Sequence, residues 1–387
     1  MNMKLNKLIT RSIAVVGLAC AVHAQGSSFQ IRAAEILLGD GTRIGDGVLL
    51  IEEGRIRKVG RGVEVDPALP LVEHDGVLTA GLVACQTQSG VRGGASDSTR
   101  SIMPDARVAD SLDTTHGDLE KALEAGITAV VLSPGPSNVV GGYTAVVKTT
   151  GKRVSDQAHL SLSFSRQALT PGNGRPAEVE STSSGTRRGL RFPTSYSGAT
   201  AELNRLFGEG EGVYGAAKRG ELPVLIEAWH RNEVARAAGF ASRHGLTGAI
   251  RGATLATDLV EPLRASGLGV VLGPFQTAQA SHVVESVRAL GDAGVPMAFA
   301  LDGPAFDPQQ MRLSAAMAVA LGADPAVTMR ALTSDAARIA GVAERLGSIE
   351  RGRDADLVLW SGDPLNLTSR VEAVYVDGAL VHRGDSQ

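Results

Sequence analysis

The sequence has 387 residues, of which 43% are hydrophobic and 20% are charged. This composition is ordinary for a globular protein and provides ample apolar surface for a large core. The formal net charge is -3, whereas proteins that bind nucleic acids or anionic membranes are usually basic, so neither kind of partner is indicated. Aromatic residues make up only 4% of the chain, which argues against a base-stacking surface or a sugar-lined groove.

The first 24 residues have the pattern of a signal peptide. A basic start precedes an apolar segment, residues 12–22, that is too short to span a bilayer. Small residues before Gln25 indicate cleavage after residue 24, so we expect an exported protein, periplasmic or extracellular. A lipoprotein anchored through Cys20 is the alternative. The remaining chain has no long apolar run, so we expect no membrane span.

Both ends of the mature chain have the alternation of β-strands. Residues 25–78 contain strand candidates separated by glycine-containing turns. Residues 346–387 end in two apolar runs joined by an Asp-Gly turn, which is a strong hairpin signal. Because no helical pattern separates the strands within either segment, we predict that the two segments form one composite β-domain, a small sandwich.

The middle of the chain, residues 79–345, alternates strand and helix candidates. The strands are expected at 81–85, 129–132, 223–227, 248–251, 269–272 and 297–301, and the helices at 118–125, 232–244, 280–293 and 309–321. This alternation predicts a parallel sheet, either a barrel or a doubly wound sheet. Residues 171–198 are rich in Gly, Pro, Ser and Thr and are predicted to be a long loop. No glycine-rich phosphate loop follows a strand, so we expect no nucleotide site.

Residues 347–365 closely resemble the C-terminal signature of the metal-dependent amidohydrolases. Residues 77–83 and 125–130 are similar to the start of that family's first and second barrel strands, and residues 330–341 to its last barrel helix. The chain is identified on these segments as an amidohydrolase of the imidazolonepropionase-like branch. The resemblance implies a TIM-like (β/α)8 barrel with its site at the C-terminal ends of the strands, and it favours the barrel over the doubly wound sheet.

The resemblance also implies hydrolysis of non-peptide carbon–nitrogen bonds by water that one or two metal ions, commonly zinc, activate. The family ends its first strand in His-x-His, and Gln86 and Gln88 occupy those positions here. Its further histidine positions hold Glu227, followed two residues on by Trp229, and Gly252. An amide oxygen is a weak zinc ligand and glycine offers no donor, so we expect no bound metal cofactor. Asp302 matches the family's last-strand aspartate and is the catalytic candidate.

Three other residues are candidates. Cys85 is out of phase with Gln86, so we expect it to point into the helix layer as a buried thiol rather than to act as a nucleophile. His116 follows the first strand and could reach the barrel mouth, although a loop role is favoured. Lys148 lies in a segment similar to the family, but no metal-bridging role is assigned to it. No Gly-x-Ser-x-Gly turn supports Ser-His-Asp catalysis.

These observations predict a catalytically degenerate family member, and three functional hypotheses stay open. The first is a non-catalytic partner or regulator of an active relative, or else a homo-oligomer. The second is an active hydrolase with a rebuilt site, in which Glu227 and Asp302 hold a hard ion such as calcium or magnesium. The third is a binding protein that uses the old pocket for a small amide-like ligand.

Overall fold

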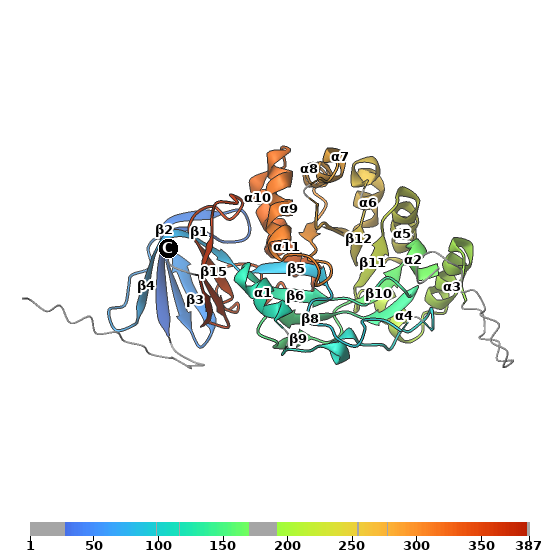
Figure 1. Ribbon diagram of the computed structural model, residues 1–387, viewed down its shortest axis with the longest axis horizontal. Coiled ribbons are helices and arrows are strands. Elements are labelled where there is room, and N and C mark those ends of the chain that lie inside the picture. Colours follow the sequence, from blue (N-terminus) through green and yellow to red (C-terminus); the bar gives the residue numbers. More distant parts are fainter. Residues whose placement is uncertain are drawn as a thin grey trace, which may run out of the picture.

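The computed structural model describes residues 28–384, except residues 98, 116, 170–191, 254 and 277. The expected signal peptide, His116 and most of the expected 171–198 loop lie outside the described residues. Figure 1 shows two parts side by side, a β-rich domain built from the first and last strands of the described chain and a larger barrel covered by helices. In the described part of the chain, no helix combines the length and apolar character needed to cross a membrane.

The β-rich domain is a sheet of seven strands that both chain ends build together (Figure 1, blue and dark red). The strands are β17 (Ala379–Arg383), β16 (Val371–Val376), β15 (Leu357–Trp360), β4 (Leu71–Ala80), β1 (Phe29–Leu37), β2 (Arg43–Glu52) and β3 (Arg55–Gly60), in that order across the sheet. The two ends of the chain meet where β15 pairs antiparallel with β4. One face of the sheet buries its own apolar cluster, which includes Ile31, Leu49 and Leu359.

The barrel consists of two sheets that join into a ring. Its strands are β5 (Leu82–Thr87), β6 (Ile127–Leu132), β7 (Val140–Tyr143), β8 (Ala145–Lys148), β10 (Leu160–Ser163), β11 (Val224–Ala228), β12 (Gly248–Gly252), β13 (Gly269–Leu272) and β14 (Met297–Phe299). Only Thr144 separates β7 from β8, and this segment pairs antiparallel with β10 at one end and with β6 at the other. On the opposite side, the Leu301 N–H donates to the Gln86 carbonyl at 2.9 Å and connects β14 to β5.

Helices cover the outside of the ring. They are α1 (Asp118–Glu124), α3 (Tyr196–Glu209), α4 (Gly212–Lys218), α5 (Arg231–His244), α6 (Val260–Ser266), α7 (Ser281–Val284), α8 (Ser286–Asp292), α9 (Gln309–Ala320) and α10 (Pro325–Leu332). Between these helices and the strands lies the largest apolar cluster. The other face of the strands lines the barrel interior with a smaller cluster, which also contains α11 (Ser334–Ile339). His159, just before β10 begins, contacts the Ile339 carbonyl at 2.7 Å, so α11 closes the N-terminal end of the barrel.

The predicted fold class, a TIM-like (β/α)8 barrel with an additional β-rich domain, is confirmed. The sequence predicts a small sandwich for the composite domain, whereas its described strands form one seven-stranded sheet. Seven strand positions of the described ring run parallel to one another. The β7–β8 segment occupies the remaining position and runs antiparallel to its neighbours β10 and β6. The helix expected over 280–293 is divided into α7 and α8 at Glu285. The loop expected to reach residue 198 ends earlier, because the Ser195 side chain accepts from the Gly198 N–H and caps α3. The exact domain limits stay a prediction.

A buried ion cluster joins the barrel to the β-rich domain. The Lys148 ammonium, at the end of β8, donates to Asp354, Asp356 and Asp377 at 2.9, 2.8 and 2.7 Å. Burial alone would lower the pKa of Lys148, but the three carboxylates outweigh it and raise that pKa. Arg345 adds a second cation at 2.7 Å from Asp354. Lys148, for which the sequence suggested no role, is therefore a structural residue of the domain junction.

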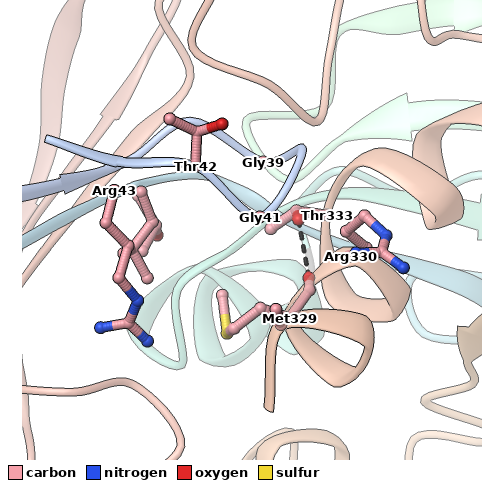
Figure 2. Close-up of a pocket in the computed structure, with 10 residues that line it drawn as sticks. Gly39, Gly41, Thr42, Arg43, Met329, Arg330 and Thr333 are labelled. Atoms are coloured by element: carbon pink, nitrogen blue, oxygen red, sulfur yellow. Dashed lines mark hydrogen bonds between the residues drawn. The ribbon is translucent and has the colours of Figure 1, made fainter. Parts of the chain in front are cut away.

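A small pocket lies at the same junction, between the start of β2 and helix α10 (Figure 2). Thr333 donates to the Met329 carbonyl at 2.7 Å on its wall. The Arg43 and Arg330 side chains point away from each other in Figure 2. Each is paired outside the pocket, Arg43 with Glu35 at 3.1 Å and Arg330 with Asp335 at 3.7 Å. The pocket brings no catalytic set of side chains together.

Candidate functional site

Four polar side chains meet inside the barrel at the C-terminal ends of the strands. They are Gln86 of β5, Glu227 of β11, Arg251 of β12 and Asp302, which follows β14. The Arg251 Nε donates to the Gln86 Oε1 at 3.0 Å, and its Nη2 lies 3.4 Å from the Asp302 Oδ1. Because β12 pairs with neither β5 nor β14, these contacts cross the barrel interior. The residues therefore form one cluster in the barrel mouth.

Trp229 completes this cluster on the β11 side. The Arg251 guanidinium carbon lies 4.4 Å from the centroid of the indole ring, at the distance of a cation–π contact. The indole N–H donates to the Glu227 Oε1 at 2.7 Å. The mouth cluster, as we call it, consists of Gln86, Glu227, Trp229, Arg251 and Asp302. Its guanidinium lies between an amide, an indole face and carboxylates.

Strand periodicity explains why Arg251 faces inward. Ala249 belongs to the apolar cluster of the barrel interior, and side chains two residues apart in a strand share a face. Sequence reasoning missed Arg251 as a site residue, because the expected family pattern directed attention to Gly252. A signal was available: a charged side chain ends an apolar strand of a parallel sheet, where both faces are normally buried.

A register shift in β5 corrects the expectation for Cys85. Ala84 pairs with Val130 and Thr87 with Leu132, so β5 has one residue more than β6 over this stretch. Cys85 shares the interior face with Val83, two residues earlier, and the extra residue lets Gln86 face the interior as well. The Cys85 thiol contacts the Ala336 carbonyl at 3.1 Å. The prediction that it points into the helix layer is wrong. Burial raises the pKa of the Cys85 thiol, so it stays protonated and is no nucleophile.

The charges of the mouth cluster are unevenly exposed to solvent. Arg251 is 1% exposed, whereas the Asp302 side chain is 37% exposed. Burial raises the pKa of Glu227, and Asp302 adds to this effect while Arg251 opposes it. The Arg251 Nη1 is buried and has no hydrogen-bond partner among the described residues. The cluster thus combines one permanent cation with two carboxylates, one deep and one open to solvent.

Asp302 is held in place through its backbone. Its φ of 66° lies in the left-handed region, which non-glycine residues seldom adopt. Its carbonyl accepts from the Thr87 hydroxyl at 2.6 Å and from the Gln88 N–H at 2.9 Å. The carboxylate is therefore presented to the mouth from a rigid backbone position.

The other two expected positions, Gln88 and Gly252, are placed differently. The Gln88 amide lies at the loop after β6, since a Cβ added at Gly135 would be 3.2 Å from its Nε2. Gly252 has a φ of 109°, and a Cβ there would lie 2.5 Å from the Ala228 carbonyl oxygen and 3.0 Å from the Trp229 ring. The structure thus brings Gln86, Glu227 and Asp302 together, leaves Gln88 at the rim, and has no space for a side chain at 252.

Glu233 fixes the loop that carries Trp229. Its carboxylate accepts from the backbone N–H groups of Trp229 and His230 at 2.9 and 3.1 Å. It also accepts from the Tyr196 hydroxyl at 2.7 Å. Burial, together with this hydrogen bond to a carboxylate, raises the pKa of Tyr196 to about 12. These contacts cap α5 and orient the indole, so Glu233 is a supporting residue rather than a reacting one.

The donor set does not fit a zinc ion of the kind the family resemblance implies. Zinc sites in proteins use imidazole, thiolate and carboxylate ligands in tetrahedral geometry. Within the described ranges, no three His, Cys, Asp or Glu side chains are grouped so that they could hold a metal ion. The mouth cluster offers two carboxylates and an amide oxygen around a guanidinium. A cation already lies where the strand ends converge.

Comparisons with known proteins relate this chain to one family. The model of the amidohydrolase family matches residues 227–381. Amidohydrolase tasK of Hapsidospora irregularis is 24% identical over 86% of the chain. Imidazolonepropionase of Sphingopyxis alaskensis is 25% identical over 85% of the chain. The crystal structure of an amidohydrolase from Thermotoga maritima MSB8 superposes with a TM-score of 0.79 and 25% identity, covering 92% of this chain and 100% of that one.

The lengths of these relatives differ. The chain spans 39% of the length of amidohydrolase tasK, but 90% of the Sphingopyxis imidazolonepropionase. The family match covers the strand ends that carry Glu227, Arg251 and Asp302 as well as the C-terminal strands of the β-rich domain. The solved structure covers barrel and β-rich domain together. The chain is a member of the amidohydrolase superfamily.

Proposed function

We propose that this protein is a non-catalytic member of the amidohydrolase superfamily that acts as a partner or regulator of an active relative. One observation carries the proposal: the strand-end positions expected to hold imidazole ligands carry Gln86, Gln88 and Glu227 instead. Without a metal ion, no described residue of the mouth cluster would lower the pKa of a water molecule toward neutrality. The Asp302 carboxylate is already engaged in an ion pair, with its Oδ1 3.4 Å from the Arg251 Nη2.

The active-hydrolase alternative would need another group to stabilise the oxyanion that forms when water attacks an amide. Arg251 is the cation available in the mouth cluster, but it is 1% exposed and a substrate carbonyl cannot reach it. A calcium or magnesium ion between Glu227 and Asp302 would face the same guanidinium at short range. The geometry therefore supports loss of hydrolysis better than a rebuilt site.

Binding of a small amide-like ligand is a second candidate. Two features favour it: the open Asp302 carboxylate and the partly exposed Trp229 indole face the mouth together. An amide N–H could donate to the carboxylate while apolar parts of the ligand pack on the ring. Such binding is compatible with a regulatory role, because a ligand could report substrate supply to an active relative.

The decisive experiment measures metal content and turnover in the same preparation. The mature chain, produced with zinc in the medium, is analysed for bound metals and assayed with N-acyl amides, cyclic amides and imidazolonepropionate. We expect far less than one zinc ion per chain and no turnover above a preparation lacking the protein. One zinc per chain, together with turnover that a chelator abolishes, would contradict the proposal.

The partner hypothesis needs a separate test from the native source. We propose that the protein is exported, so the partner is sought in the cell envelope and the medium. Affinity purification of the tagged full-length chain is expected to recover a family member that retains its histidines. Recovery of a homodimer or monomer, with no effect on the activity of an added relative, would favour the ligand-binding candidate instead.

A further inference from the structure

We infer that Arg251 is the resident cation of this site: its guanidinium takes the place of the metal ion, holds the mouth cluster together and excludes divalent ions. The inference rests on the proposed loss of metal-dependent chemistry and names the residue responsible for it. Within the mouth cluster, Arg251 contacts one residue of β5, one residue that follows β11 and one that follows β14.

The Arg251 guanidinium lies where a metal ion would have to bind. Gln86, Glu227 and Asp302 come from three strands that are far apart in sequence, and the point where they converge is occupied by the guanidinium. A divalent ion would have to approach carboxylate oxygens to about 2.0–2.6 Å. The Arg251 Nη2 already lies 3.4 Å from the Asp302 Oδ1, so ion and guanidinium cannot share this space.

Charge is the second argument. Arginine stays protonated at every accessible pH, so the cation is permanent and needs no uptake from solution. The guanidinium balances one of the two carboxylates, as part of the charge of a metal ion would. A second cation brought into the same interior would be repelled at low effective dielectric constant.

The chemistry of the partners is the third argument. An amide oxygen is a weak zinc ligand but a good acceptor for a guanidinium N–H, and Gln86 uses its Oε1 in this way at 3.0 Å. The Trp229 indole presents its face to the cation and its N–H to Glu227, and an indole cannot ligate a metal. The mouth cluster therefore forms one consistent set around a guanidinium.

The variant Arg251→Met tests the inference, because it removes the charge and keeps a long apolar side chain. It leaves an amide oxygen and two carboxylates without the cation that lay between them, and an oxygen-rich set of this kind suits manganese or calcium. The full mature chain would be titrated with MnCl2 in a calorimeter. Quenching of Trp229 emission provides a second readout, since the chain has only one other tryptophan, Trp360.

Three comparisons make the outcome specific. We expect Arg251→Met to bind Mn²⁺ at least tenfold more tightly than the wild type. Arg251→Lys, which keeps a cation, should behave as the wild type, and adding Asp302→Asn to Arg251→Met should abolish the gain. Arg251→Gln replaces Arg251→Met if the latter does not fold, as judged by circular dichroism.

Two results would overturn the inference. One is tight binding of one Mn²⁺ per chain by the wild type, and the other is a folded Arg251→Met or Arg251→Gln protein with no gain in Mn²⁺ affinity. Neither depends on turnover. Chelator-resistant hydrolysis by the wild type would contradict the proposed function while leaving the role of Arg251 intact, so the two failures are distinguishable.

Discussion

The mouth cluster and the buried ion cluster around Lys148, here called the junction cluster, both surround a buried cation with carboxylates. They differ in how many of the cation's N–H groups have hydrogen-bond acceptors. At the junction, Lys148 donates to three carboxylates within 2.9 Å, which uses all three of its N–H bonds. In the mouth, Arg251 has one amide acceptor, one carboxylate at 3.4 Å and an Nη1 without a hydrogen-bond partner among the described residues. The carboxylate contact of Arg251 is thus longer than any of the three that Lys148 makes.

The two clusters also differ in where their members come from. The junction acids Asp354, Asp356 and Asp377 all lie in or beside the C-terminal strands, so one segment supplies every partner of Lys148. The mouth cluster draws on four separate strand ends of the barrel. A cluster built from one segment and one lysine can serve assembly of two domains, whereas convergence of four strand ends is the usual geometry of a barrel active site. The mouth therefore has the layout of a barrel active site.

The largest effect should follow removal of the junction cation. Lys148→Met would leave three acidic side chains without their shared partner in a buried interface. We expect a loss of about 3–5 kcal/mol in the free energy of unfolding, measured by urea denaturation. Lys152→Met is the matched control, because Lys152 pairs with Asp377 at 2.8 Å but is 53% exposed. Its loss should stay below about 1 kcal/mol, and equal losses would refute a structural role for Lys148.

A glycine in the mouth should be the next most sensitive position. Gly252→Ala forces a Cβ to within 2.5 Å of the Ala228 carbonyl oxygen at a φ of 109°. We expect a loss of roughly 3 kcal/mol in unfolding free energy, since strain and clash add. Gly62→Ala is the control, because a Cβ there meets nothing within 4 Å. Tolerance of alanine at 252 would show that this strand end can accept a side chain, as the family ligand position requires.

A pH experiment separates the acids of the junction. Burial raises the pKa of Asp356 to about 6 despite Lys148, while Lys148 and Arg345 lower the pKa of Asp354. A carboxyl with a raised folded pKa binds its proton more tightly in the folded state. The contribution of Asp356 to the free energy of unfolding is therefore greatest below its unfolded pKa near 3.8, and this contribution declines as the pH rises to about 6.

The measurement compares wild type with Asp356→Asn in urea denaturation between pH 4 and 6.5. We expect the wild type to lose on the order of 2 kcal/mol relative to the variant across this range and to stay level above it. A parallel pH dependence of the two proteins would contradict the raised pKa. The lowered pKa of Asp354 acts only at lower pH, so it does not confound the comparison.

The smallest effect should come from the deep carboxylate of the mouth. Glu227→Gln keeps an acceptor for the Trp229 indole and removes a charge that burial opposes. Because the folded pKa of Glu227 is raised, its contribution to stability falls as pH increases past its ordinary value near 4.5. We expect the variant to equal the wild type at pH 4 and to gain up to about 1 kcal/mol at pH 7. Thermal unfolding at the two pH values checks this, and a loss at pH 7 would mean that ionised Glu227 stabilises Arg251.

Local sequence patterns were sufficient to predict much of the fold of this protein. The alternation of strands and helices, the hairpins of both chain ends and the signature at residues 347–365 predicted the barrel and the shared β-sheet. The identity of Gln86, Gln88 and Glu227 at the expected ligand positions is itself a property of the sequence. These features depend on residue type, spacing and turn chemistry, which are local properties and can therefore be predicted from the sequence.

The tertiary structure alone decided how those residues are used. The extra residue in β5 lets Cys85 and Gln86 both face the interior, and a bulge cannot be recognised in an apolar run that is buried on both faces. Arg251 became a site residue because β5, β11, β12 and β14 converge around it, although its partners lie 22 to 165 positions away along the chain. Lys148 found its three acids more than 200 residues away. Charges pair through space, and only the closed barrel and its junction bring these groups within hydrogen-bonding distance.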